Sequence, residues 1–188
     1  MNHTLGLAAA LCVAAVAAGC SAQQDTAERP AEGGPMTIGG DSGELCFSLN
    51  EIPSLNLAYA VDRLVNESDK PLDVVAFHAV NAQNVRASEA YVAPVPNPGT
   101  LIGAANTWPA GTTKEPIHTA AWQKRQPLGG YVLPAHSENT SYNLVVHLIV
   151  EADTKSASLD SLQVDYRADG KIYRAATSTR VVLKPSCL

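Results

Sequence analysis

Short runs of apolar residues, either continuous or alternating with polar residues, begin at position 45 and predict β-strands. Turn-forming residues separate these runs, and no long amphipathic helical period is visible among them. The predicted strands cover residues 45–49, 57–66, 72–80, 85–92, 131–133, 142–151, 162–167, 172–175 and 179–183. The pattern therefore indicates an all-β fold built from short strands.

Two places in this pattern also predict how strands are arranged. Residues 142–151 are apolar on both alternating sets of positions, which is typical of a central strand covered on both faces. Asp169-Gly170, between the runs 162–167 and 172–175, is a strong signal for a two-residue hairpin turn. We therefore expect these last two strands to be antiparallel neighbours.

The strand pattern is interrupted by residues 93–130, which contain six of the 12 prolines. A short strand over residues 100–104 fits the pattern, but only at a sheet edge, because proline cannot donate a hydrogen bond to a ladder. Seven to nine antiparallel strands with loop-rich connections favour an immunoglobulin-like β-sandwich with a long proline-rich insertion. A closed barrel is the alternative.

Composition sets limits on the class of protein. The chain has 188 residues, of which 46% are hydrophobic and 16% charged, so it is neither intrinsically disordered nor a charged coiled coil. Thirteen basic and 18 acidic residues give a net charge of −5. A basic surface for nucleic acid is therefore not expected.

The apolar stretch 5–19 is too short for a membrane-spanning helix, which needs roughly 20 residues, and is typical of a secretory signal. It ends in Val16-Ala17-Ala18-Gly19-Cys20, which resembles the lipobox of bacterial lipoproteins. In that family the peptide is cut before the cysteine, and the cysteine sulfur carries a diacylglyceryl lipid. The resemblance implies that residues 1–19 are a signal peptide and that Cys20 is the lipidation site.

An ordinary secretory signal, with Cys20 as a free thiol, is the alternative interpretation of this segment. Cys12 is a poorer candidate for lipidation because Leu11 precedes it. Residues 20–44 are polar, rich in glycine and acidic, with five acids against the single base Arg29. They predict a flexible acidic tether, so the folded domain is expected to cover residues 45–188.

Further segments resemble the small secreted lipoproteins of high-GC Gram-positive bacteria (actinobacteria). They are residues 65–72 (Val-Asn-Glu-Ser-Asp-Lys-Pro-Leu) and 164–170 (Val-Asp-Tyr-Arg-Ala-Asp-Gly), together with the alanine-rich signal and the cysteine near the C-terminus. The resemblance spans the whole chain. It implies a single immunoglobulin-like domain, lipid-anchored on the extracytoplasmic face of the cell membrane, and brings no catalytic or binding residues with it.

Two cysteines remain outside the signal and the lipidation site, Cys46 and Cys187. An exported protein meets an oxidising compartment, so this even number predicts a disulfide between them. Two free thiols are the alternative. The wide separation matches neither a redox motif of the Cys-x-x-Cys type nor a zinc motif.

The sequence contains no catalytic motif. Gly-x-Ser-x-Gly, a Ser-x-x-Lys set and a glycine-rich phosphate loop are all absent, and nothing near His118 or His136 completes a triad. We therefore predict no enzymatic activity and no cofactor. An exported, copper chaperone-like metal protein remains the alternative function. It has little support, because Met36 is the single methionine after the signal and no two histidines are two or four positions apart.

The proline-rich insertion is the candidate partner-binding loop. Its candidate residues are Trp108, His118, Trp122 and Arg125, because loops on a rigid scaffold commonly carry binding residues and tryptophan and arginine are frequent anchors. The alternative is that both tryptophans cover the open end of the sandwich. We accordingly expect a non-enzymatic interaction or accessory module of the cell envelope, with the membrane and an envelope protein or ligand as partners.

Overall fold

The computed structural model of the chain describes residues 29–39, 42–52, 54–97, 99–109 and 116–187. The predicted signal peptide and Cys20 lie outside these residues. The strands are β1 (Met36–Gly39), β2 (Gly43–Ser48), β3 (Asn56–Asn66), β4 (Leu72–Val80), β5 (Val85–Val95), β6 (Gln126–Pro127), β7 (Val132–Leu133), β8 (Ser141–Val150), β9 (Ala157–Leu159), β10 (Ser161–Ala168), β11 (Lys171–Ala176) and β12 (Thr179–Lys184). The helices are α1 (Pro116–Gln123) and the short 3-10 helices Leu49–Glu51 and Ser137–Asn139.

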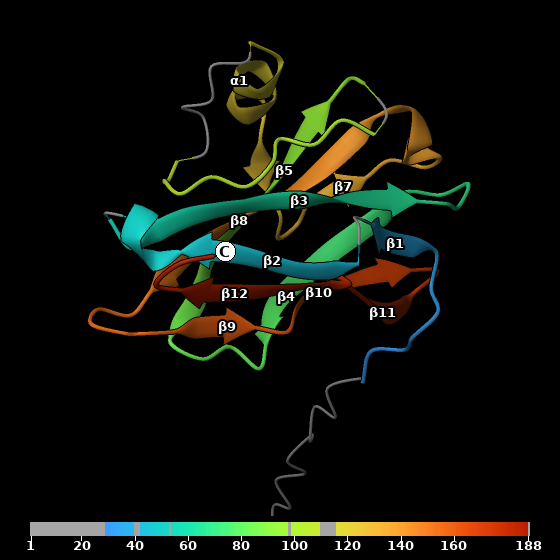
Figure 1. Cartoon of the computed structure of the whole chain (residues 1–188). Helices are drawn as coiled ribbons and strands as arrows, with labels where there is room; N and C mark the ends of the chain where they lie inside the picture. Colours follow the sequence, from blue (N-terminus) through green and yellow to red (C-terminus); the bar gives the residue numbers. More distant parts are fainter. Residues whose placement is uncertain (1–28, 40–41, 53, 98, 110–115, 188) are drawn as a thin grey trace, which may run out of the picture.

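The described strands form three sheets (Figure 1). A five-stranded sheet has the order β1-β3-β8-β5-β6, a four-stranded sheet the order β11-β10-β4-β7, and a three-stranded sheet the order β2-β12-β9. The pairings are antiparallel except for β2 with β12, which run parallel. The fold is therefore mostly β, as predicted, with the strands divided among separate sheets instead of one closed ring.

One large apolar core joins the three sheets. It receives Leu57, Leu64 and Leu148 from the five-stranded sheet, and further residues from both smaller sheets. Among the latter are Val164 of β10 and Leu183 of β12, both fully buried. The five-stranded sheet thus forms one layer, and the two smaller sheets together form the other.

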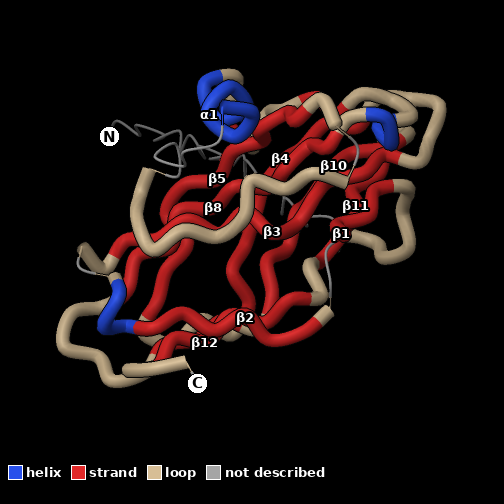
Figure 2. The backbone as a smooth tube through the Cα atoms, turned by 45° about the horizontal axis from the view of Figure 1, so that its top comes forward, coloured by secondary structure: helices blue, strands red, loops and turns tan. Residues whose placement is uncertain are grey.

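One face of the five-stranded sheet packs on this core. Its other face is covered by the proline-rich insertion between β5 and β7 (Figure 2), and α1 lies on the side opposite the β2–β12 pair. The sheet contributes small residues here, Ala58, Ala60 and Ala93, and the insertion places Ile102 and Trp122 against them. These small side chains let the insertion approach the sheet closely. This second apolar cluster explains why β8 is apolar on both faces, as its sequence predicted.

The folded part begins earlier than the sequence predicted. Residues 36–39 form β1, which pairs with β3, and β2 begins at Gly43, although residues 20–44 were expected to be a flexible tether. Met36 and Ile38 are 3% and 8% exposed and belong to the core. Two buried side chains in a four-residue strand are too short an apolar pattern to be recognised within a polar, glycine-rich segment.

All nine predicted strands coincide with observed strands to within three residues at each end. Asp169 and Gly170 form the β10–β11 turn with φ values of 47° and 77°, as expected for a two-residue hairpin. The sequence did not predict β6, β9 or α1. The short strand expected over residues 100–104 does not form. At the edge of β3, however, the Gly103 N–H donates to the Ala60 carbonyl, and Ala105 and Ala58 exchange two backbone hydrogen bonds.

The turn between β3 and β4 is organised by Asn66, which is fully buried. Its amide nitrogen donates to the carbonyl oxygens of Lys70 and Pro134, at 2.7 and 3.0 Å. Its side-chain oxygen accepts from the backbone N–H of Ser68 at 2.9 Å, and its own N–H donates to Ser137. The Asn-Glu-Ser sequence in this segment therefore has a structural role.

Candidate functional site

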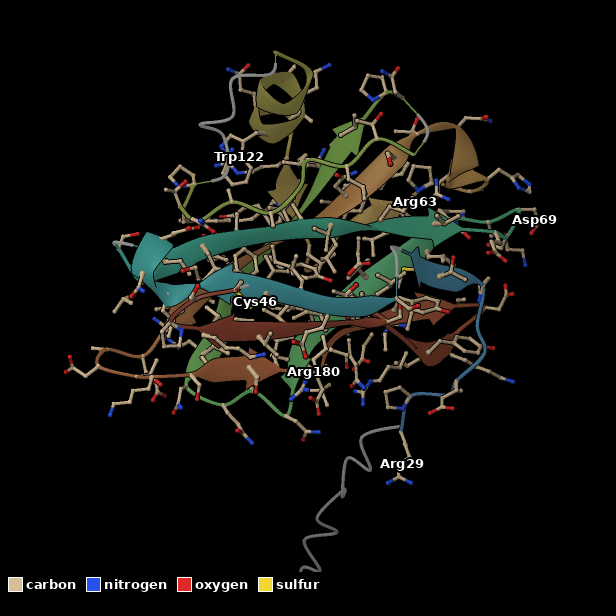
Figure 3. The ribbon with its side chains drawn as sticks, in the orientation of Figure 1. Arg29, Cys46, Arg63, Asp69, Trp122 and Arg180 are labelled. Atoms are coloured by element: carbon tan, nitrogen blue, oxygen red, sulfur yellow. A yellow bond between two sulfur atoms is a disulfide. The ribbon has the colours of Figure 1, made fainter. Side chains whose placement is uncertain are left out.

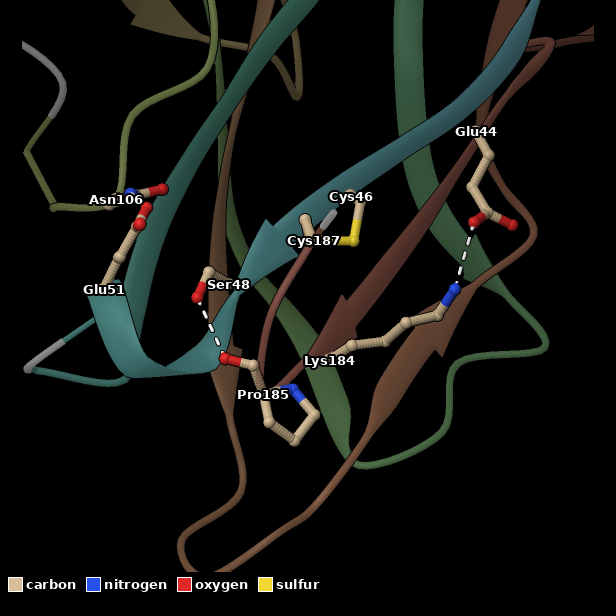
Figure 4. Close-up of a disulfide and its surroundings, with 8 residues drawn as sticks. All are labelled: Glu44, Cys46, Ser48, Glu51, Asn106, Lys184, Pro185 and Cys187. Atoms are coloured by element: carbon tan, nitrogen blue, oxygen red, sulfur yellow. Dashed lines mark hydrogen bonds and ion pairs between the residues drawn. A yellow bond between two sulfur atoms is a disulfide. The ribbon is translucent and has the colours of Figure 1, made fainter.

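The predicted disulfide is present: Cys46 of β2 is bonded to Cys187, and their Cα atoms are 5.9 Å apart. Figure 4 shows the bridge where the chain end turns back after β12. The Ser48 hydroxyl donates to the Pro185 carbonyl at 3.0 Å, and Lys184 lies 3.4 Å from Glu44. The bridge and these polar contacts hold β2 and β12 together as a parallel ribbon.

The predicted loop residues Trp108, Trp122 and Arg125 lie together, but they are packed onto the fold. Trp122 is 7% exposed and belongs to the second apolar cluster, below α1 (Figure 3). The guanidinium carbon of Arg125 lies 4.0 Å from the centroid of the Trp122 ring and 5.2 Å from that of Tyr91. The side chain of His118 lies outside the described residues.

Trp108 is attached to the sheet through His147 of β8. The two rings are stacked, with centroids 4.4 Å apart and an interplanar angle of 4°. His147 Nε2 lies 2.8 Å from the Asn56 side-chain oxygen, and burial lowers the pKa of His147. A neutral ring whose Nε2–H donates to Asn56 fits this arrangement. Both tryptophans are therefore packed on the fold, as in the alternative interpretation, but they lie on a face of the five-stranded sheet and not at the open end of the sandwich.

A groove of about 390 Å³ lies between β2 and β3, and sequence reasoning missed it. Three partly apolar walls come from Leu45 of β2, Val61 of β3 and Leu101 of the insertion. Polar groups are supplied at one end by residues 42–44 and by Thr179 of β12. A volume of this size is within the range of small-ligand sites, roughly 300–1,000 Å³.

The groove lies along an edge of the β2–β12 ribbon. β2 is the terminal strand of its sheet, and its strand pairing within the described residues is with β12 alone. An edge strand presents backbone N–H and C=O groups that can pair with an additional strand. No sequence signal could have found this edge, because it results from parallel pairing between the second and the last strands of the fold.

Beside the groove is a buried polar pair. The Tyr59 hydroxyl donates a hydrogen bond to Asp62, and both side chains are fully buried. Burial and the neighbouring carboxylate raise the pKa of Tyr59, and burial also raises the pKa of Asp62. Sequence reasoning gave no weight to these two residues, since a single acid within a strand is not by itself a signal.

A second polar group lies on the outer face of the four-stranded sheet. Arg174 makes two hydrogen bonds to the Asp165 carboxylate, at 2.6 and 2.8 Å, and His78 Nε2 lies 3.0 Å from the same carboxylate. Arg174 is the main cause that lowers the pKa of Asp165, with the His78 hydrogen bond adding to it. The carboxylate is already paired with two neighbours, so the arrangement is a partly buried structural network.

The described residues contain no group of three or more His, Cys, Asp or Glu side chains that could hold a metal ion. His78 and His147 lie on different sheets, and His136 lies at the start of the 3-10 helix Ser137–Asn139 with a left-handed backbone. Nor is any helix in the described part of the chain long and apolar enough to cross a membrane.

No protein-family model matches the chain, and the comparison with curated proteins gives no significant match.

Proposed function

We propose that this protein is a non-enzymatic interaction module on the extracytoplasmic face of the cell membrane, anchored by lipid on Cys20. The Cys46–Cys187 disulfide supports export, because structural disulfides form and persist in oxidising compartments. The lipobox-like sequence supports the anchor. Two or three acyl chains give stable attachment, since each buried methylene contributes about 0.8 kcal/mol.

The main support for an interaction role is the edge of β2, which has no strand partner among the described residues on the side of the groove. Adding an extended segment to an exposed sheet edge uses backbone hydrogen bonds for affinity and side-chain pockets for selectivity. At this edge, Leu45, Val61 and Leu101 supply apolar walls for the side chains of such a segment. The proposed partner is therefore an envelope protein that offers an extended, partly apolar strand.

The insertion is the weaker candidate for partner contact. Trp122 and Trp108, its two largest side chains, pack against the sheet and against His147. Arg125 is held over the Trp122 ring, and its Nη1 donates to the Trp122 carbonyl at 3.0 Å. The side chains that the sequence suggested as anchors for a partner are therefore already in contact with the rest of the fold.

In-cell photocrosslinking tests the groove. A photoreactive benzoylphenylalanine at Ser42, which lines the groove, should give a discrete covalent adduct with a partner. The same residue at Lys155, an exposed site before β9, is the matched control, because β9 begins at the opposite end of the ribbon. Adducts that are absent at Ser42, or equal at the two sites, would contradict the proposal.

The immunoglobulin-like connectivity is also part of this proposal. The two-layer arrangement and the pairing of an early strand, β2, with the last strand support it.

The alternative function, an exported metal-binding protein, has no observation in its favour in the described part of the chain. Copper or zinc near one equivalent in the purified native protein would favour that alternative.

A further inference from the structure

Tyr59 and Asp62 are three positions apart in β3, so in a regular strand their side chains would point to opposite faces. A register shift between these two residues interrupts the pairing of β3 with β8 and inserts an extra residue. As a result both side chains point into the protein interior and form a hydrogen bond. Each is 0% exposed.

The hydrogen bond leaves the Asp62 carboxyl group only partly satisfied. Tyr59 donates to Oδ2, while Oδ1 has no hydrogen-bond partner among the described residues. Thr177, two residues before β12, and Thr179, its first residue, lower the pKa of Tyr59 through hydrogen bonds to its side chain. A buried carboxylate without a cation partner is costly, so burial raises the pKa of Asp62 and stabilises the neutral acid relative to the same group in water.

The charged groups nearest the groove do not compensate Asp62. Glu44 lies 3.6 Å from Arg180 and 3.4 Å from Lys184, so the two bases of β12 pair with that exposed acid. The influences on the pKa of Asp62 are burial, which raises it and is the larger, and the Tyr59 hydrogen bond, which lowers it.

The pair is next to residues that line the groove. Val61, the neighbour of Asp62, forms part of the groove wall, and Thr179, which interacts with Tyr59, forms another part. The pair therefore adjoins the seam where β3 faces the β2–β12 ribbon.

We propose that the Tyr59–Asp62 pair is a proton-operated latch on this seam: it is closed while Asp62 carries a proton, and loss of the proton opens the groove to water. The latch acts on the same groove that the proposed function uses, but it does not depend on what binds there.

The direction of the effect follows from proton linkage. A carboxyl group with a raised pKa in the folded state binds its proton more tightly there than in the opened state, so its contribution is complete at low pH and is lost as pH rises through the raised pKa. At pH values between the pKa of Asp62 in the opened state and its raised pKa in the closed state, each pH unit shifts the closed-to-open equilibrium about tenfold toward the open form.

The test combines two measurements on the purified full chain without any ligand. Carbon-13 NMR of the Asp62 carboxyl group should show a titration midpoint clearly above the ordinary value of about 3.9. Hydrogen exchange between pH 4.5 and 9, corrected for intrinsic rates, should show protection of β2, β3 and the start of β12 falling with pH across the same midpoint. In Asp62→Asn, which keeps the size and cannot ionise, that loss of protection should disappear.

Asp73→Asn is the matched control, because Asp73 is an exposed acid on β4, and its protection profile should follow that of the unmodified chain. In Tyr59→Phe the carboxylate loses its donor, so the midpoint should move to higher pH. An Asp62 midpoint at or below the ordinary value would overturn the latch. So would a pH-dependent loss of protection in Asp62→Asn equal to that of the unmodified chain.

Discussion

The guanidinium group of Arg125 covers the face of the Trp122 ring, with 4.0 Å between the guanidinium carbon and the ring centroid. Arg125 follows the end of α1 by two residues, and Trp122 is the helical residue that enters the second apolar cluster. The arrangement fixes the end of the insertion on the five-stranded sheet. It also gives these two residues a structural role that can be measured independently of any partner.

Trp122→Ala should destabilise the fold by about 3–5 kcal/mol, because it removes a large buried ring from a cluster that the small alanines of the sheet cannot refill. Denaturant unfolding of the purified domain measures this loss. Arg125→Ala should cost only about 0.5–1 kcal/mol, as expected for a partly exposed cation–π contact. A small effect of Trp122→Ala together with a lost crosslinked partner would instead indicate recognition by the insertion.

Removal of the disulfide should lower stability through the unfolded state. The bridge closes a sequence separation of 141 residues, for which chain entropy gives an upper figure of about 5 kcal/mol. Unfolding of the double variant Cys46→Ala, Cys187→Ala, compared with the oxidised chain, measures the difference. Equal unfolding midpoints for the two proteins would show that the bridge has no stabilising role.

Asn66→Ala should cost about 2 kcal/mol, because it removes hydrogen bonds from several partly buried backbone groups in and around the β3–β4 turn. Ser68→Ala is the comparison, since Ser68 is less buried and its hydroxyl makes only local contacts. Thermal unfolding of both variants should show the larger decrease for Asn66→Ala. The reverse order would mean that Asn66 does not organise the turn.

Acid should destabilise the protein through Asp165. Arg174 lowers the pKa of this carboxyl group in the folded state, so its contribution is present above the unfolded pKa of about 3.9 and is lost as pH falls through the lower folded value. Unfolding measured between pH 2 and 5 should show a flatter acid limb for Asp165→Asn than for the unmodified chain. If the loss of stability with falling pH were the same in Asp165→Asn, it would be caused by other carboxyl groups. The sign is opposite to that predicted for Asp62.

Nine strands could be predicted from the sequence because their apolar residues alternate with polar ones or form continuous runs. Residues 142–151 even predicted the central position of β8, since both faces are apolar. The Asp169-Gly170 turn was found for a similarly local reason. The disulfide followed from an even number of cysteines outside the predicted signal peptide and the predicted lipidation site.

Features that depend on long-range pairing could not be predicted. β1 contributes only Met36 and Ile38 to the core, and its surroundings are polar. The groove exists because β2 pairs with β12, which comes from the other end of the chain. The unpaired edge of β2 then lies beside Val61 and Leu101. The burial of Trp122 depends on alanines of two different strands, Ala58 and Ala60 of β3 and Ala93 of β5, which have no distinctive spacing.

The anchor has its own test. The N-terminal peptide of the natural protein should begin at Cys20 and carry a diacylglyceryl lipid, as mass spectrometry would show. Cys20→Ala should release the protein from the membrane fraction. An unmodified chain that retains residues 1–19 would contradict both the anchor and the assigned location.

The most direct test of the groove as the contact surface compares two lysine substitutions in cells that carry the photoreactive residue at Ser42. Leu101→Lys places a charge in the groove wall, and Val132→Lys places the same charge at a side chain that is 51% exposed on the four-stranded sheet. The account predicts that the Leu101→Lys protein loses the covalent adduct while the Val132→Lys protein keeps it, both at normal protein levels. Loss of the adduct with Val132→Lys and its persistence with Leu101→Lys would contradict the account.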